Sequence, residues 1–179
     1  CIRDRYRAFF GVKGKVMYPK MDVIFRMIRE ILNTSDVTDT RRLHEIISRV
    51  KSRAQSSLVS AGHSTAVLRA ASYASPMAAF QDGMAGIAYY QFIEKLDREF
   101  DDRKEEIIEN LKSLMVAILR PENLCISYTG ERESLDSVQK QIRELKKTLH
   151  QEVTESSSSE MICQKKNEGF MTSGQVQYV

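Results

Sequence analysis

Three histidines, His44, His63 and His150, carry the side chains with which this sequence could build a metal-dependent hydrolase. A helical zinc hydrolase places two histidines on one helix face, with a nearby glutamate that activates water. His44 and Glu45 begin such a motif, but no second histidine follows at the spacing that would complete it. His63 and His150 are isolated in the sequence. The residues therefore predict no metal site, no bound cofactor and no catalytic residue in this segment.

Serine and glycine motifs supply no other catalytic centre. Ser60, His63 and Ser64 lie together in the stretch SAGHS, but the G-x-S-x-G pattern of a hydrolase nucleophile is absent. These residues fall between two expected helices, where serine commonly serves as a helix cap. The glycines and lysines at 11–15 match no phosphate-binding loop and open no helix directly. We therefore expect neither a serine hydrolase nor a nucleotide-binding enzyme.

Composition and charge argue against two classes of partner. The 179 residues are 42% hydrophobic and 28% charged, with a net charge of +3 and a pI of about 8.7. No long block of like charges marks a nucleic-acid arm, and no apolar run approaches the roughly 18 residues of a membrane span. The opening residues CIRDRYR do not resemble a secretory signal, and the first is not methionine, so we expect a fragment or a processed product. Neither nucleic acid nor membrane is predicted as a partner.

The three cysteines, Cys1, Cys125 and Cys163, are odd in number and far apart. They form no C-x-x-C pair, so free thiols in a reducing compartment are the favoured interpretation. A disulfide or a thiolate metal site is the alternative. The predicted location is cytoplasmic, with an organelle matrix as the alternative if the source is eukaryotic.

Hydrophobic periodicity predicts that helices make up most of the chain. Gly62 is expected to end the second helix in a left-handed conformation, and a turn containing Gly83 and Gly86 is expected to precede the fourth. Six helices are expected. Their ranges are Met21–Leu32, a cap within Asp36–Asp39 to about Leu58, His63–Ala74, the end of the Gly83–Gly86 turn to about Phe100, Asp101 to Pro121, and Ser134–Leu149.

Three stretches have the alternating pattern of β-strands: Ala8–Tyr18, Leu124–Thr129 and Gly174–Val179. Together with the helices they predict an α+β fold, in which a small antiparallel sheet has several helices packed on one face. Residues 1–150 are expected to form one α+β domain. A polar linker is expected over 151–168, and the first strand of a following, truncated domain over 169–179.

Four stretches of this chain, in order, resemble the presequence-protease-like branch of the insulinase/pitrilysin zinc metallopeptidases. None of them is a catalytic motif, so the likeness depends on their shared order along nearly the whole chain. The stretches are AGHSTAVLRAASYASP (61–76), DGMAGIAYYQFIEKL (82–96), RPENLCISYTG (120–130) and NEGFMTSGQVQYV (167–179).

The resemblance implies an architecture for a longer parent chain. Such peptidases have two halves, each of two related α+β domains, that close over a chamber admitting unfolded peptides. This chain resembles the third, non-catalytic domain, so the zinc ligands of the parent are expected upstream of residue 1. Its implied role is to form chamber wall and to help one half dock on the other. The implied partners are the remaining domains of the same peptidase and the peptide substrate.

His63, Arg69 and Tyr73 are the residues that we expect to line the chamber, since they follow one another near a helix junction. The alternative is that they cap helices or pack within the domain. The isolated segment is expected to bind no zinc and to cleave nothing.

A second reading is a helical protein-interaction module with no peptidase activity, and a third is an RNA-binding domain, whose affinity would fall steeply with salt. Topology is expected to separate the first two readings. Antiparallel pairing of 124–129 with 10–18 would favour the peptidase segment, and a purely helical bundle would favour the interaction module.

Overall fold

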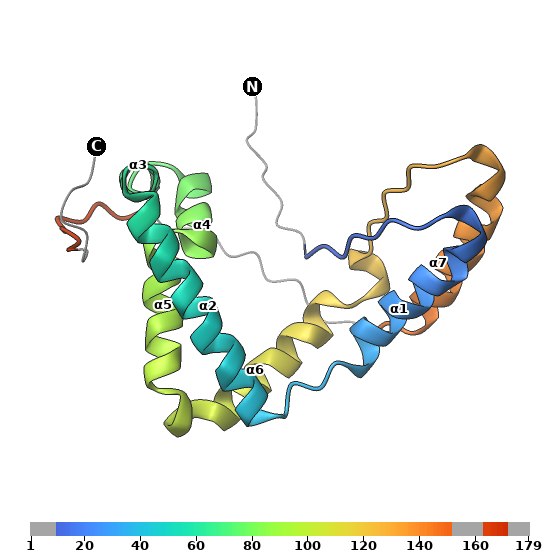
Figure 1. Cartoon of the computed structure of the whole chain (residues 1–179), viewed down its shortest axis with the longest axis horizontal. Coiled ribbons are helices and arrows are strands. Elements are labelled where there is room, and N and C mark those ends of the chain that lie inside the picture. The colour runs from blue at the N-terminus through green and yellow to red at the C-terminus, as the bar shows by residue number, and fades with distance from the viewer. Residues whose placement is uncertain (1–9, 152–162, 172–179) are drawn as a thin grey trace. The chain divides into compact units, whose positions relative to one another are not determined.

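The computed structural model describes residues 10–151 and 163–171 of the chain (Figure 1). The chain folds as two compact units, each built from two separate stretches of sequence. Within the described residues, the first unit comprises 10–38 and 105–151, and the second comprises 39–104 and 163–171. Each unit has its own set of buried side chains.

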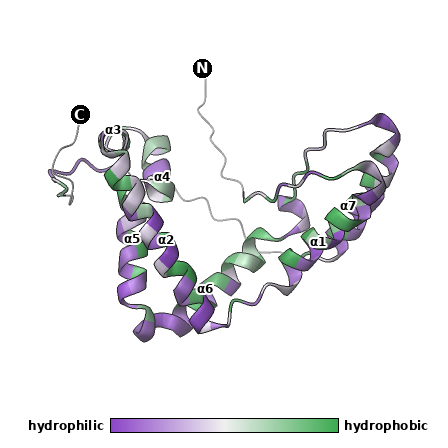
Figure 2. Ribbon diagram, viewed as in Figure 1, coloured by the Kyte–Doolittle hydropathy of each residue, from purple (hydrophilic) through white to green (hydrophobic). Residues whose placement is uncertain are grey.

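The first unit is built on two amphipathic helices that pack against each other, α1 (Met21–Thr34) and α7 (Leu135–Lys147). Figure 2 shows hydrophobic bands alternating with hydrophilic bands along both helices. Short 3-10 turns at Tyr18–Lys20 and Arg132–Ser134 lead into them. Their shared core consists of Met21, Phe25, Val138 and Leu145.

The long helix α6 (Phe100–Ile118) begins in the second unit and ends in the first. A 3-10 turn at Pro121–Asn123 follows it. The backbone N–H of His150 donates to the carbonyl of Leu119 at 3.0 Å, which ties the chain after α7 to the end of α6.

Four helices form the second unit. The helix α3 packs on α4, and α5 packs on both α2 and α4. Their bounds are α2 Thr40–Ser60, α3 Gly62–Ser72, α4 Pro76–Ala85 and α5 Ile87–Arg98. Their buried apolar residues, with the first residue of α6, are Ile47, Ala78, Ile87, Ile93 and Phe100.

The helices predicted from periodicity are confirmed, but two glycine predictions are wrong. Gly62 begins α3 instead of ending α2, and no described glycine has a positive φ. Gly83 lies inside α4, because Ser75 caps that helix and Pro76 occupies its first turn. These start signals outweigh the cost of one internal glycine. Gly86 does break the helix, where an added Cβ would lie 2.2 Å from the Asp82 Oδ1.

The predicted α+β fold is wrong for the part of the chain that the structure describes, which contains helices and no strand. Residues 10–17 and 124–129 are irregular, and within the described part of the chain no backbone hydrogen bond pairs them. A strand requires a second backbone beside it, whereas here Val16, Leu124 and Tyr128 pack their side chains on the α1–α7 core. The strand predicted at 174–179 lies outside the described residues.

The start of α2 provides a direct test of a predicted cap. The Asp39 carboxylate accepts the backbone N–H of Arg42 at 2.9 Å. Replacing Asp39 with alanine should lower the free energy of unfolding by about 1 kcal/mol, because an N-terminal amide of the helix loses its acceptor. The control is Asp39→Asn, which keeps an acceptor. Urea denaturation followed by circular dichroism measures both, and equal losses in the two variants would contradict the cap.

Candidate functional site

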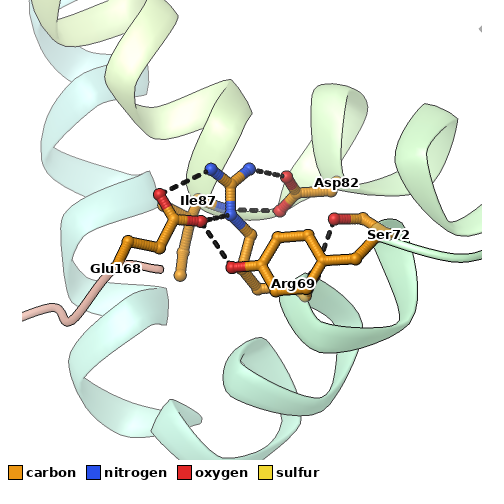
Figure 3. Close-up of polar contacts among 6 residues, drawn as sticks. Arg69, Ser72, Asp82, Ile87 and Glu168 are labelled. Atoms are coloured by element: carbon orange, nitrogen blue, oxygen red, sulfur yellow. Dashed lines mark hydrogen bonds and ion pairs between the residues drawn. The ribbon is translucent and has the colours of Figure 1, made fainter. Parts of the chain in front are cut away.

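A buried arginine joins three segments of the second unit. Arg69 lies in the last turn of α3 and is only 7% exposed. A buried guanidinium must be paired, because an isolated charge is costly to remove from water. Two carboxylates and a tyrosine surround it. We call Arg69, Tyr73, Asp82 and Glu168 the Arg69 clasp (Figure 3).

Asp82 is the inner carboxylate of the clasp and is 2% exposed. Arg69 Nη1 donates to its Oδ2 at 2.5 Å, and the backbone N–H of Ile87 donates to its Oδ1 at 2.9 Å. Asp82 on α4 therefore holds both the guanidinium from α3 and the first amide of α5. The missing side chain of Gly86 leaves room for this carboxylate.

Glu168 is the outer carboxylate and comes from the segment 163–171. Arg69 Nε donates to its Oε1 at 2.5 Å and Nη2 donates to its Oε2 at 3.1 Å, so the fork of the guanidinium is matched by two oxygens. The Tyr73 hydroxyl donates to Oε1 at 2.6 Å. The guanidinium carbon also lies 5.8 Å from the centre of the Phe170 ring, within cation–π range.

These contacts favour one protonation state for each group. Hydrogen bonds from Arg69 and then Tyr73 lower the pKa of Glu168 to about 2. The hydrogen bond to Glu168 raises the pKa of both Arg69 and Tyr73 above their ordinary values. The three groups therefore do not change charge near neutral pH. Such a set can bind and position a segment, but it offers no proton donor or acceptor for catalysis.

Titration of Glu168 tests the outer half of the clasp. Because its pKa is depressed, the docked carboxylate contributes stability at neutral pH, and this is lost as the pH falls from about 4.5 towards 2. Carbon-13 NMR of the Glu168 carboxyl should give a midpoint near 2. Tyr73→Phe should raise that midpoint, since one donor is lost. A midpoint at the ordinary value of about 4.5 would contradict docking.

A second polar cluster surrounds Asp97 on α5. Asp97 accepts hydrogen bonds from Lys51 and from the Ser48 hydroxyl at 2.6 Å, and these bonds, that of Lys51 first, lower its pKa. His44 Nε2 lies 3.4 Å from the Asp97 Oδ1, and its ring stacks on Phe100 with the centres 4.4 Å apart. The Ser48 hydroxyl donates to Asp97 and not to His44, so the histidine is not placed to activate the serine.

The donor set does not fit zinc in residues 10–151 and 163–171. No three histidine, cysteine, aspartate or glutamate side chains in that part come together as metal ligands. Both cysteines within it, Cys125 and Cys163, are free thiols. No helix in the same part is long and apolar enough to cross a membrane.

Two of the three residues proposed to line a chamber meet in the clasp. Arg69 and Tyr73 share Glu168, whereas His63 is exposed at the start of α3 and no described hydrogen bond joins it to them. Sequence reasoning missed Asp82 and Glu168. Both lie in stretches that carry the family resemblance, DGMAG and NEGF, and that was the available signal.

Comparisons with known proteins agree with the resemblance seen in the sequence. HypA of Clostridium perfringens (strain 13 / Type A) is 27% identical over 176 residues, which cover 98% of this chain and 18% of HypA. Presequence protease 1, chloroplastic/mitochondrial, of Arabidopsis thaliana is 24% identical over 131 residues, covering 73% of this chain and 12% of the relative. The mitochondrial presequence protease of Yarrowia lipolytica is 27% identical over 106 residues, covering 59% and 11%.

The chain thus spans less than a fifth of the length of these relatives. No solved structure matches it. The model of the peptidase-associated family that accompanies metallopeptidase family sixteen, subfamily C, matches residues 3–96, more than half of the chain. The resemblance to the presequence-protease-like branch of the insulinase family is confirmed. The chain belongs to this peptidase-associated family.

Proposed function

We propose that this chain is a non-catalytic segment of a longer zinc metallopeptidase that degrades unfolded peptides in an enclosed chamber. It contributes part of the chamber wall and helps one half of the enzyme dock on the other. The family match over residues 3–96 is the observation that carries this proposal. Its partners are the other domains of the same peptidase, and the peptide in the chamber is the substrate.

The relatives support a division of labour within one long chain. Two of them are named presequence proteases, and this chain matches only 12% and 11% of their lengths. Most of such a protein lies outside the matched region, which leaves room for the zinc ligands elsewhere. Their names also place them in mitochondria or chloroplasts. We propose a reducing compartment for this chain, either cytoplasm or an organelle matrix.

Exposed apolar side chains support a docking role. Met27 and Ile31 are one turn apart on α1, so they share a face, and both are exposed. Val67 on α3 and Met84 on α4 are also exposed. Neighbouring large apolar side chains left in water on one helix face, as Met27 and Ile31 are, fit a surface that contacts other polypeptide. The remaining domains of the peptidase are the natural partner for them.

A helical interaction module is the second candidate. The all-helical character of the described residues favours it, because a helical bundle was the topology expected for such a module. The two candidates differ in whether the same polypeptide must also carry the zinc-binding motif of a hydrolase. A module of this kind needs no zinc motif in the same polypeptide, whereas the peptidase segment does.

Two measurements test the proposal. The purified chain should hold no stoichiometric zinc after dialysis and should not hydrolyse an unfolded fluorogenic peptide. The coding sequence upstream of Cys1 should encode a histidine–glutamate zinc motif, and the full protein should hydrolyse that peptide until a chelator is added. Hydrolysis by the isolated chain would overturn its non-catalytic role. If the full protein had neither a zinc motif nor peptide hydrolysis, the interaction module would be the remaining candidate function.

A further inference from the structure

We propose that Arg69, Tyr73 and Asp82 form a docking site for a peptide segment that presents a glutamate and, two residues later, an aromatic ring. The occupant is residues 163–171 of this chain, which supply Glu168 and Phe170. The inference goes beyond the proposed peptidase role and does not depend on it.

The receiving side of the site is held in place by the helices. Asp82 is fixed by the Ile87 amide and in turn fixes Arg69 Nη1. This leaves the edge of the guanidinium that carries Nε and Nη2 turned towards Glu168, as Figure 3 shows. A guanidinium with one edge already paired presents the other as a rigid fork, which suits a carboxylate better than a single point charge does. Asp82 and the Ile87 amide therefore position the Arg69 guanidinium without any contribution from the segment that it binds.

The occupant, in contrast, is held by side chains. Residues 163–171 form neither helix nor strand, and within the described part of the chain no backbone–backbone hydrogen bond holds them. Glu168 supplies the carboxylate, and Phe170 supplies a ring 5.8 Å from the guanidinium carbon. Recognition that depends on two side chains can be transferred to a separate peptide of the same sequence. It also defines the ligand chemically: an acidic residue, then any one residue, then an aromatic residue.

Competition in trans tests the site on the full-length chain. In Glu168→Gln, the amides of residues 167–170 should become mobile by heteronuclear NOE. The signals of α2–α5 should persist, because the Arg69–Asp82 pair remains. A synthetic peptide of residues 163–171, CQKKNEGFM, should then bind saturably and shift the Arg69 Nε–H signal. The same peptide with glutamine at the position of Glu168 should bind at least about tenfold more weakly, since a charge-assisted pair is lost.

Phe170→Ala provides a second variant at an exposed position, where loss of the fold is not expected. It too should mobilise residues 167–170, because the cation–π contact is lost. The proposal is overturned if residues 167–170 stay rigid in both variants. Equal binding of the two peptides, or no binding at millimolar concentration, would overturn it as well. None of these results depends on peptidase activity, so failure here leaves the proposed function untouched.

Discussion

Replacing Arg69 with methionine is expected to lower the free energy of unfolding of the second unit by about 3–5 kcal/mol. Methionine fills much of the same volume but leaves the Asp82 carboxylate buried without its cation. An unpaired buried charge costs far more than the pair contributes when intact. Since small domains are stable by only about 5–15 kcal/mol, this loss is a large fraction of the total.

Removing the charge on the partner should recover part of that loss. In the double variant Arg69→Met with Asp82→Asn, no carboxylate remains buried at this position, and asparagine can still accept the Ile87 amide. The coupling energy between the two sites should be about 1–3 kcal/mol, the range for groups in one network. The coupling energy also requires the single variant Asp82→Asn, and urea denaturation followed by helical circular dichroism measures all three variants.

The matched control is an arginine in an exposed pair. Arg41 contacts Glu45 one turn away on α2, and most of its side chain is in water. Arg41→Ala should change the free energy of unfolding by less than about 0.5 kcal/mol, because such pairs are screened and cost side-chain entropy. If Arg69→Met were no worse than Arg41→Ala, the clasp would not be a structural element of the second unit.

Periodicity predicted the helices well because burial of one face is a local property of the sequence. The stripe of α1 and the cap at Asp39 can both be seen within a few turns. The clasp could not be found that way. Arg69 and Glu168 are 99 residues apart, and the sequence carries no periodic signal for a bond between them. For Arg69 and Tyr73, the sequence offers only their place near a helix junction.

The strand prediction failed for a related reason. Alternation in Leu124–Thr129 shows that one side of an extended segment is apolar, but it does not show what covers that side. Here the α1–α7 core accepts Leu124 and Tyr128, so no second backbone is required. Topology was therefore a poor criterion for choosing between peptidase segment and interaction module. The ordered match of sequence along the chain was the better one.

Replacing Leu145 with alanine is the second substitution expected to have a large effect, and it should destabilise the first unit. Leu145 is 3% exposed and belongs to the four-residue core shared by α1 and α7. Truncating a buried leucine removes apolar contacts and leaves a cavity, which costs about 2–5 kcal/mol. With so few residues in this core, α1 and α7 should lose most of their protection against hydrogen exchange. Helices α2–α5 should keep theirs, because they belong to a separate compact unit.

Leu135 supplies the matched control on the same helix. It begins α7 but is 42% exposed and is not part of the core. The change to alanine is chemically identical, and alanine is the better helix former, so Leu135→Ala should cost less than about 1 kcal/mol. Hydrogen exchange measured by mass spectrometry reports both variants helix by helix. Equal loss of protection in the two would contradict the core assigned to the first unit. Loss of protection in α2–α5 on Leu145→Ala would show that the two units unfold together.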